Sequence, residues 1–254
     1  MSLELVLLAI ASLLAGVIDS IVGGGGLVLV PALFATFPSA PPATLLGTNK
    51  LAAIWGTLIA SRQYSKRVNL EWRVLIPAAA FALLGSFCGA WAVTLVDPTF
   101  MRRLLPLVLI AVLLYTLWNK NLGTSNIPRY SGARAVAVTS AIGGVIGFYD
   151  GFFGPGAGSF FVFLLVRWMG YDFLNASASA KVLNVATNFA ALVLFTLKGH
   201  VWWQVGLILA VANIAGSIMG AHLALKYGAS FVRRIFIGVV SMLILKTTYD
   251  TFFR

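Results

Sequence analysis

Two lysines and two aspartates lie inside long apolar stretches of this 254-residue chain. The aspartates are Asp19 and Asp150, and the lysines are Lys50 and Lys181. A charged side chain inside an apolar membrane segment costs about 3 kcal/mol unless it faces protein or water. We expect the lysines to hold a small anion and the aspartates to act in gating or proton relay. The structural alternatives are lysines that extend to the membrane surface and aspartates that cap a helix.

Amide side chains accompany these lysines at helical spacing. Three polar residues share one helix face with Lys181, and they are Ser177, Asn184 and Asn188. The matching stretch of the first half contains Asn49, Lys50 and Thr57. A polar stripe on an otherwise apolar helix predicts the lining of a cavity, and hydrogen bonding between helices is the alternative.

Each aspartate comes just before a cluster of glycines. Gly23–Gly26 follow Asp19, and Gly154-Pro155-Gly156 follow Asp150. Runs of glycine, and proline, end helices. Each cluster therefore predicts a helix that is broken inside apolar sequence. The alternative is a flexible surface loop. The free N–H groups at the start of the next helix favour anions.

Together these residues predict one anion site between two broken helices. Its expected substrate-binding residues are Gly24, Gly25, Gly26, Asn49, Lys50, Tyr149, Gly156, Ala157, Gly158, Lys181, Asn184 and Asn188. The two helix N-termini would meet near the middle of a membrane and hold a small oxyanion.

Composition determines which elements position this site. The chain is 60% hydrophobic and only 10% charged, whereas soluble domains carry about 25% charged residues. It is therefore expected to be an all-α, polytopic membrane protein in a lipid bilayer. The net charge of +11 suits cytoplasmic loops beside anionic lipid and also an anionic substrate. A nucleic-acid partner is not expected, because the basic residues are scattered between apolar segments.

The apolar segments fall into two similar halves. We expect a first repeat over residues 1–118, a linker over 119–133 and a second repeat over 134–254. The expected segments of the first repeat are Leu3–Phe37 with its break, Ala43–Ser61, Val74–Val96 and Leu104–Trp118.

A shift of 131 residues brings landmarks of the two halves together. It aligns the two aspartates, the two lysines, Trp72 with Trp203, and the pair Arg102-Arg103 with Arg233-Arg234. We infer an internal duplication, which with broken helices is typical of transporters. The loop Arg62–Arg73 is more basic than its counterpart, which favours an inverted arrangement of the halves, although the Arg pairs lack that asymmetry.

The sequence does not bring together the residue types that a catalytic or metal site needs. His200 and His222 are isolated, Cys88 is the only cysteine, and no nucleophile motif or phosphate loop is found. We therefore expect neither an enzyme nor a cofactor nor a metal site.

Two motifs resemble a known family. They are Ala15-Gly16-Val17-Ile18-Asp19-Ser20-Ile21-Val22-Gly23-Gly24-Gly25-Gly26-Leu27 with Gly47-Thr48-Asn49-Lys50-Leu51, and Gly147–Gly156 with Ala178–Asn184. Such paired motifs are similar to those of the sulfite exporter TauE/SafE family. The resemblance implies a multi-pass permease of the bacterial-type inner membrane that moves sulfite, sulfonates or related organosulfur anions.

These observations predict a secondary transporter for a small sulfur-containing oxyanion, with the sulfur chemistry implied by the resemblance alone. A passive anion channel and a non-transporting membrane subunit are the alternatives. The substrate, the direction of transport, proton coupling and assembly into a homo-oligomer stay open at this point.

Overall fold

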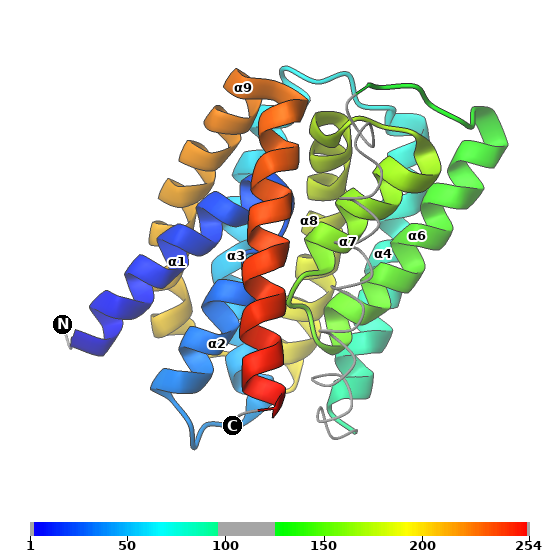
Figure 1. Ribbon diagram of the computed structural model, residues 1–254. Helices are drawn as coiled ribbons and strands as arrows, with labels where there is room; N and C mark the ends of the chain where they lie inside the picture. Colours follow the sequence, from blue (N-terminus) through cyan, green and yellow to red (C-terminus); the bar gives the residue numbers. More distant parts are fainter. Residues whose placement is uncertain (1–2, 96–124, 253–254) are drawn as a thin grey trace.

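The computed structural model describes residues 3–95 and 125–252, and helices with short connections make up this part of the chain (Figure 1). The predicted all-α membrane fold is confirmed. Five helices are long and apolar enough to cross a membrane: α1 (Leu3–Val22), α4 (Trp72–Val93), α6 (Gly132–Phe152), α8 (Phe173–Leu197) and the Trp203–Gly238 part of α9 (Trp203–Phe252). The expected segment Leu104–Trp118 and the first residues of the expected linker lie outside the described residues.

Three further helices complete the described bundle. They are α2 (Gly26–Thr36), α3 (Pro42–Ser65) and α7 (Ala157–Leu164), which continues as a π-helical turn over Leu165–Met169. Pro42 occupies the first turn of α3, where a missing N–H is tolerated. Asp172 caps α8 by accepting a hydrogen bond of 2.7 Å from the Asn175 N–H.

Helix starts repeat at the interval that the sequence comparison uses. The starts of α2 and α7, of α3 and α8, and of α4 and α9 are each 131 residues apart (26 and 157, 42 and 173, 72 and 203). The two halves therefore have the same order of elements in the described part. The duplication behind this order stays a prediction.

The connections gather at two ends of the bundle. Residues 66–71, 125–131 and 170–172 lie at one end, where the Ile127 N–H donates to the Gly170 carbonyl at 2.9 Å. Burial and the negative charge of Glu71 raise the pKa of Tyr171 to about 12, which places residues 66–71 there as well. Residues 37–41 and 198–202 lie at the other end, where His200 Nδ1 is 3.3 Å from the Thr44 hydroxyl.

Basic residues are concentrated at the first of these ends, which we call the basic end. Its described connections and their bordering helix turns carry Arg62, Lys66, Arg67, Arg73, Arg129, Arg134 and Arg167. Among the described connections at the opposite end, Lys198 is the only lysine or arginine. The charge asymmetry between loops that the sequence showed is therefore an asymmetry between two ends of the bundle.

The two halves run through the bundle in opposite directions. Helix α3 starts at the opposite end and α8 at the basic end, whereas α4 starts at the basic end and α9 at the opposite end. Helix α1 lies parallel to the part of α9 before its break at Gly228, since Ser12 donates to Leu209 and Gly16 contacts Asn213. Helix α6 lies parallel to α4 (Figure 1). Hence the hairpin of α1 and α2 enters from the opposite end and that of α6 and α7 from the basic end, as the inverted arrangement requires.

Small residues bring these parallel helices into backbone contact. A Cβ on Gly85 or Gly89 of α4 would meet a backbone carbonyl of α6, and one on Gly216 or Gly220 would meet a carbonyl of α1. These glycines belong to a Gly-Ser-x-x-Gly-Ala sequence that occurs once on α4 and once on α9, and such small residues allow helices to pack closely.

Two adjacent glycines of α6 allow a matched test of this packing. A Cβ on Gly143 would lie 2.5 Å from the Ala78 carbonyl oxygen, whereas one on Gly144 would find its nearest neighbours at 4.0 Å. We expect Gly143→Ala to destabilise the protein by about 1–3 kcal/mol through overpacking. Gly144→Ala should leave stability unchanged or raise it by about 1 kcal/mol. Thermal unfolding in detergent measures both, and equal melting temperatures for the two variants would contradict the close contact.

The basic end is expected to face the cytoplasm, because lysine and arginine are enriched in cytoplasmic loops. After Cys88→Ser, we would introduce one exposed cysteine at a time, by Ser131→Cys at the basic end and Ser39→Cys at the opposite end. A membrane-impermeant maleimide should label the Ser39→Cys variant in spheroplasts and the Ser131→Cys variant only in inside-out vesicles. The reverse pattern would invert the assigned orientation.

Candidate functional site

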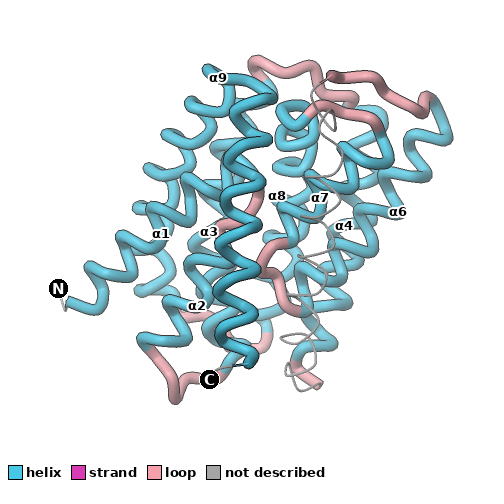
Figure 2. Tube along the Cα trace, in the orientation of Figure 1, coloured by secondary structure: helices cyan, strands magenta, loops and turns pink. Residues whose placement is uncertain are grey.

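The two chain breaks meet inside the bundle. A Cβ on Gly23 would overlap the backbone of Gly158, and a Cβ on Gly158 would overlap that of Gly23. The Ser159 N–H donates to the Gly23 carbonyl at 3.1 Å, and the Ser159 hydroxyl donates to the Val22 carbonyl at 3.1 Å. Figure 2 shows the connection between α6 and α7 as a loop in the middle of the bundle. The surface-loop alternative is therefore wrong for both glycine clusters.

Glycine is needed where the chain turns at these breaks. Gly23 and Gly156 have φ angles of 80° and 84°, in the left-handed region that favours glycine. Gly156 directly precedes α7, and Gly26 begins α2. A side chain at the contact between Gly23 and Gly158 would also separate the two hairpins. The glycine clusters therefore serve both the turn of each chain and the close approach of the two turns.

Some of the backbone N–H groups that were predicted to bind the anion are already hydrogen-bonded within the protein. The Ala157 N–H donates to the Gly154 carbonyl at 3.0 Å, and the Gly25 N–H points at Asp19 Oδ1 at 3.4 Å. These two amides are occupied, so that the expectation that they bind a ligand needs correction. Among the described residues, no acceptor is found for the amides of Gly24, Gly26, Gly156 and Gly158. Four of the six predicted amides are therefore available.

The four buried charges form two ion pairs, and each pair joins one half of the chain to the other. Lys50 Nζ lies 2.7 Å from Asp150 Oδ1, and Lys181 Nζ lies 3.0 Å from Asp19 Oδ2. The side chains of Lys50 and Lys181 are 5% and 0% exposed. Neither lysine extends to a surface, so that this alternative is wrong. The lysines are also not free cations, because an aspartate neutralises each of them.

The surroundings of the two carboxylates differ. Asp19 Oδ2 accepts from Lys181, while its Oδ1 faces the Gly25 N–H. The Thr57 hydroxyl lies 3.3 Å from Oδ2, but its proton has a shorter acceptor in the Ala53 carbonyl at 2.8 Å. Asp150 Oδ1 accepts from Lys50, but its Oδ2 is buried without a hydrogen-bond partner in the described part of the chain. A buried polar atom without a partner is costly, which makes Asp150 the less satisfied of the two.

Three largely buried residues of the predicted site have side-chain amides that lack partners but keep some exposure. Asn49, Asn184 and Asn188 are 7%, 5% and 7% exposed, and within the described residues none of their side-chain amides has a hydrogen bond. The Asn184 amide nitrogen lies 2.7 Å from the Cβ position of Gly158, and that of Asn49 lies 4.0 Å from the Cβ position of Gly26. Asn49 and Asn184 thus place unsatisfied amides directly at the two breaks.

The ion pairs lie at two levels of the bundle. Lys50 is eight residues after Pro42, so that it lies about 12 Å from the opposite end of α3, a helix of about 36 Å. Lys181 is eight residues after Phe173, about 12 Å from the basic end of α8. The two pairs therefore bound the middle third of the bundle, with the contact of the two breaks in the same region.

Aromatic residues near the breaks support the backbone. The Tyr149 hydroxyl donates to the Pro155 carbonyl at 2.6 Å, and its ring contacts Phe160 with centroids 5.3 Å apart. Tyr149 thus braces the second break, and its hydroxyl proton is already used.

Sequence reasoning missed two buried hydroxyl contacts that hold the first break. Tyr64 donates to the Ser20 carbonyl at 2.9 Å, and Ser177 donates to the Ile21 carbonyl at 2.8 Å. Ser177 stood on the predicted polar stripe, and it uses its hydroxyl for a contact between helices. For this residue the alternative of hydrogen bonding between helices is correct.

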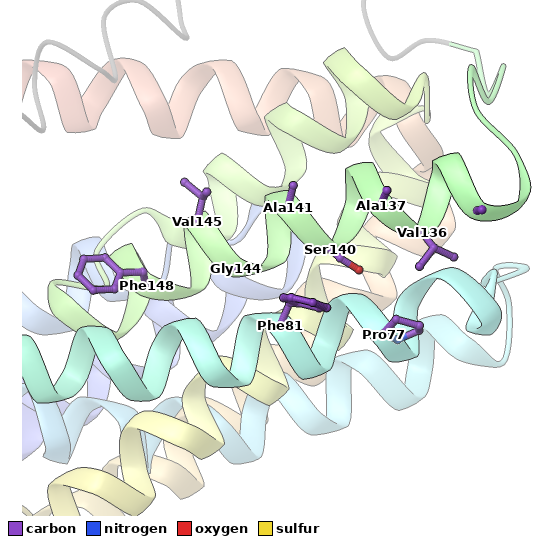
Figure 3. A pocket seen from close by; sticks show the side chains of 10 residues that line it. Pro77, Phe81, Val136, Ala137, Ser140, Ala141, Gly144, Val145 and Phe148 are labelled. Atoms are coloured by element: carbon purple, nitrogen blue, oxygen red, sulfur yellow. The ribbon is translucent and has the colours of Figure 1, made fainter.

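A separate hollow of about 970 Å³ lies between α4 and α6 (Figure 3). Its lining is apolar except for the hydroxyl of Ser140. None of the predicted site residues lines it. A lining without charge or amide groups does not suit an anion, so that we place the candidate site at the breaks and ion pairs.

Comparisons with known proteins agree on one family. The family model for the sulfite exporter TauE/SafE matches residues 8–247. A protein of Escherichia coli K12 named probable membrane transporter protein YfcA is 39% identical over 94% of this chain and 88% of its own length. Probable membrane transporter proteins of Haemophilus influenzae and of a Sinorhizobium species are 35% and 34% identical, each over 97% of this chain and 95% and 93% of their own lengths. No solved structure matches the chain.

The pairing of Lys50 with Asp150 predicts a strong coupling between their substitutions. Lys50→Gln or Asp150→Asn alone leaves one buried charge without its partner, which should cost about 3–5 kcal/mol of stability. The double variant removes both charges and should recover most of that loss. A double-mutant cycle of thermal or denaturant unfolding in detergent measures the coupling. Additive single effects would contradict the pairing.

Proposed function

The chain belongs to the sulfite exporter TauE/SafE family of membrane transporters, and we propose that it is a secondary transporter for a small sulfur-containing oxyanion. Sulfite and short sulfonates are the substrates we propose, and the bacterial-type inner membrane is the proposed location. The anion would lie where the two chain breaks meet, between the halves of the chain.

The observation that carries this proposal is the set of unsatisfied donors around the breaks. The side-chain amides of Asn49 and Asn184 and the backbone amides of Gly26 and Gly158 are the donors nearest to that contact. The two asparagine amides are not among the fully buried side-chain atoms of the described chain, so that they are accessible to a ligand. A sulfite or sulfonate group presents three oxygen atoms, each of which accepts more than one hydrogen bond. Such a group suits several donors that converge from different elements.

The topology supports a mechanism of alternating access. The two hairpins enter from opposite ends, and each ion pair links a long helix of one hairpin to α3 or α8. Breaking one pair would remove one of the two ionic links between the halves while the other stays formed. Inverted halves with broken helices at their interface are the arrangement in which one half moves against the other around a fixed site.

Ligand binding to the purified protein tests the proposed substrate class. We expect sulfite or methanesulfonate at 100 times its Kd to stabilise the protein by about 2.7 kcal/mol, and sulfate and acetate to give smaller shifts. Asn184→Ala should weaken binding by about tenfold or more, because a donor to the anion is lost. The exposed Asn69→Ala is the matched control and should bind normally. If none of these anions stabilises the protein selectively, the proposed substrate class is wrong.

Transport in proteoliposomes tests the proposed mechanism. A secondary transporter should take up labelled substrate faster when unlabelled substrate fills the lumen, because the loaded site returns more readily than the empty one. A passive channel gives no such acceleration. An uptake rate that does not change when the lumen contains unlabelled substrate would therefore favour the channel over the transporter.

A further inference from the structure

The described ion pairs leave the candidate site with no net charge. Lys50 and Lys181 contribute two positive charges, and Asp19 and Asp150 contribute two negative charges. An anion that enters this buried site without compensation adds an unpaired negative charge, which is expensive away from water. A proton on one of the two carboxylates would restore neutrality. This reasoning rests on the proposed function, because it requires an anion in the site.

We propose that Asp150 takes up one proton for each monoanion bound, and that Lys50, released from Asp150, then holds the anion. The protein is thereby a proton–anion symporter. In the empty site, the Lys50 ammonium pairs with the Asp150 carboxylate. Uptake of H⁺ and of the anion A⁻ converts this pair into a Lys50 ammonium paired with A⁻ and a neutral Asp150 carboxylic acid. One proton and one negative charge enter together, so that the charge of the site does not change.

The hydrogen bonds select Asp150 over Asp19 as the proton acceptor. Both oxygens of Asp19 have a donor, since Lys181 faces Oδ2 and the Gly25 N–H faces Oδ1, while the Thr57 hydroxyl nearby donates at 2.8 Å to the Ala53 carbonyl. Asp150 has one donor, Lys50, and its Oδ2 is buried and free to take a proton.

The residues that correspond to the neighbours of Asp19 are present in the second half, but they make no hydrogen bond to Asp150. The 131-residue shift that relates the halves carries Thr57 to Asn188 and Gly25 to Gly156. No hydrogen bond is found in the described part of the chain between Asp150 and either of these residues. The difference between the two carboxylates is therefore one of arrangement and not of residue type.

Other charged or titratable groups around Asp150 do not compete for this role. On α6 itself, the Tyr149 phenol is the neighbour, and its proton is used on Pro155. Helix α4 carries Arg73 in its first turn at the basic end, and α7 has no charged residue. Helix α8 contributes Lys181, which pairs with Asp19, and the π-helical turn contributes Arg167 near the basic end. Lys50 is the cation that contacts Asp150.

Proteoliposomes with a pH gradient test the proposal. Labelled methanesulfonate is the first probe, because it stays a monoanion over the whole pH range, and labelled sulfite is the second. With the lumen one pH unit more alkaline than the outside, the wild type should accumulate methanesulfonate about tenfold, since one proton accompanies each anion. A potassium diffusion potential alone should produce no accumulation, because the coupled step moves no net charge.

Two variants separate proton coupling from a structural role. Asp150→Asn should bind methanesulfonate independently of pH, and it should lower accumulation on a pH gradient far more than it lowers exchange. Asp19→Asn is the matched control, and it should lower exchange and accumulation in the same proportion, because Asp19 holds the first break. Accumulation by Asp150→Asn on a pH gradient would overturn the proposal.

A measurement on the wild type keeps the test decisive if Asp150→Asn does not fold. A pH-sensitive dye trapped in the lumen should report one proton for each methanesulfonate transported. Methanesulfonate transport without proton movement, or accumulation driven by the membrane potential, would overturn the proposal and leave the proposed function intact. If the wild type exchanges neither methanesulfonate nor sulfite, the proposed function fails and this inference fails with it.

Discussion

The structure depends on one constraint, which is that charges buried in an apolar bundle must be paired. Four such charges lie in the described chain, and each pair takes one partner from each half. Pairing within one half would have left the halves electrostatically independent. Because the pairs cross, neither half can move far without separating a buried lysine from its aspartate. The glycine contacts hold α6 against α4 and α1 against α9, and α6 and α1 are the helices that carry the two aspartates.

A related constraint applies to the backbone at the breaks. Irregular backbone at membrane depth survives only where protein or water satisfies its polar groups. Here the second break satisfies part of the first, since Ser159 donates twice to the end of α1. Tyr64 and Ser177 supply further donors to the same turn of α1. The amides that remain free are those at the contact between the two breaks, so that the unsatisfied groups are concentrated at one place.

The sequence predicted the components of the site better than their connections. Asp19, Lys50 and the glycine clusters were recognisable because apolar sequence tolerates such residues only for a reason, and they recur at a fixed interval. The crossed pairing was missed, although two lysines and two aspartates in apolar segments indicate it by charge balance. The internal use of the Gly25 and Ala157 amides could not be predicted, because it depends on backbone angles that the glycines leave open. The separation of basic loops between two ends did indicate the opposite directions of the halves.

The difference between the two ion pairs has a geometric meaning. Halves that run in opposite directions with equivalent contacts would leave the site equally open or equally closed toward both ends. The structure is not balanced in this way, since the Asp19 side chain is 16% exposed and fully partnered, while that of Asp150 is 6% exposed with one oxygen free. The pair of Lys50 and Asp150 lies nearer the opposite end, and it is both the more enclosed and the less satisfied. A path from the site to that end would require this pair to separate, and the proposed proton uptake by Asp150 together with the proposed anion binding to Lys50 would separate it without leaving a charge unpaired.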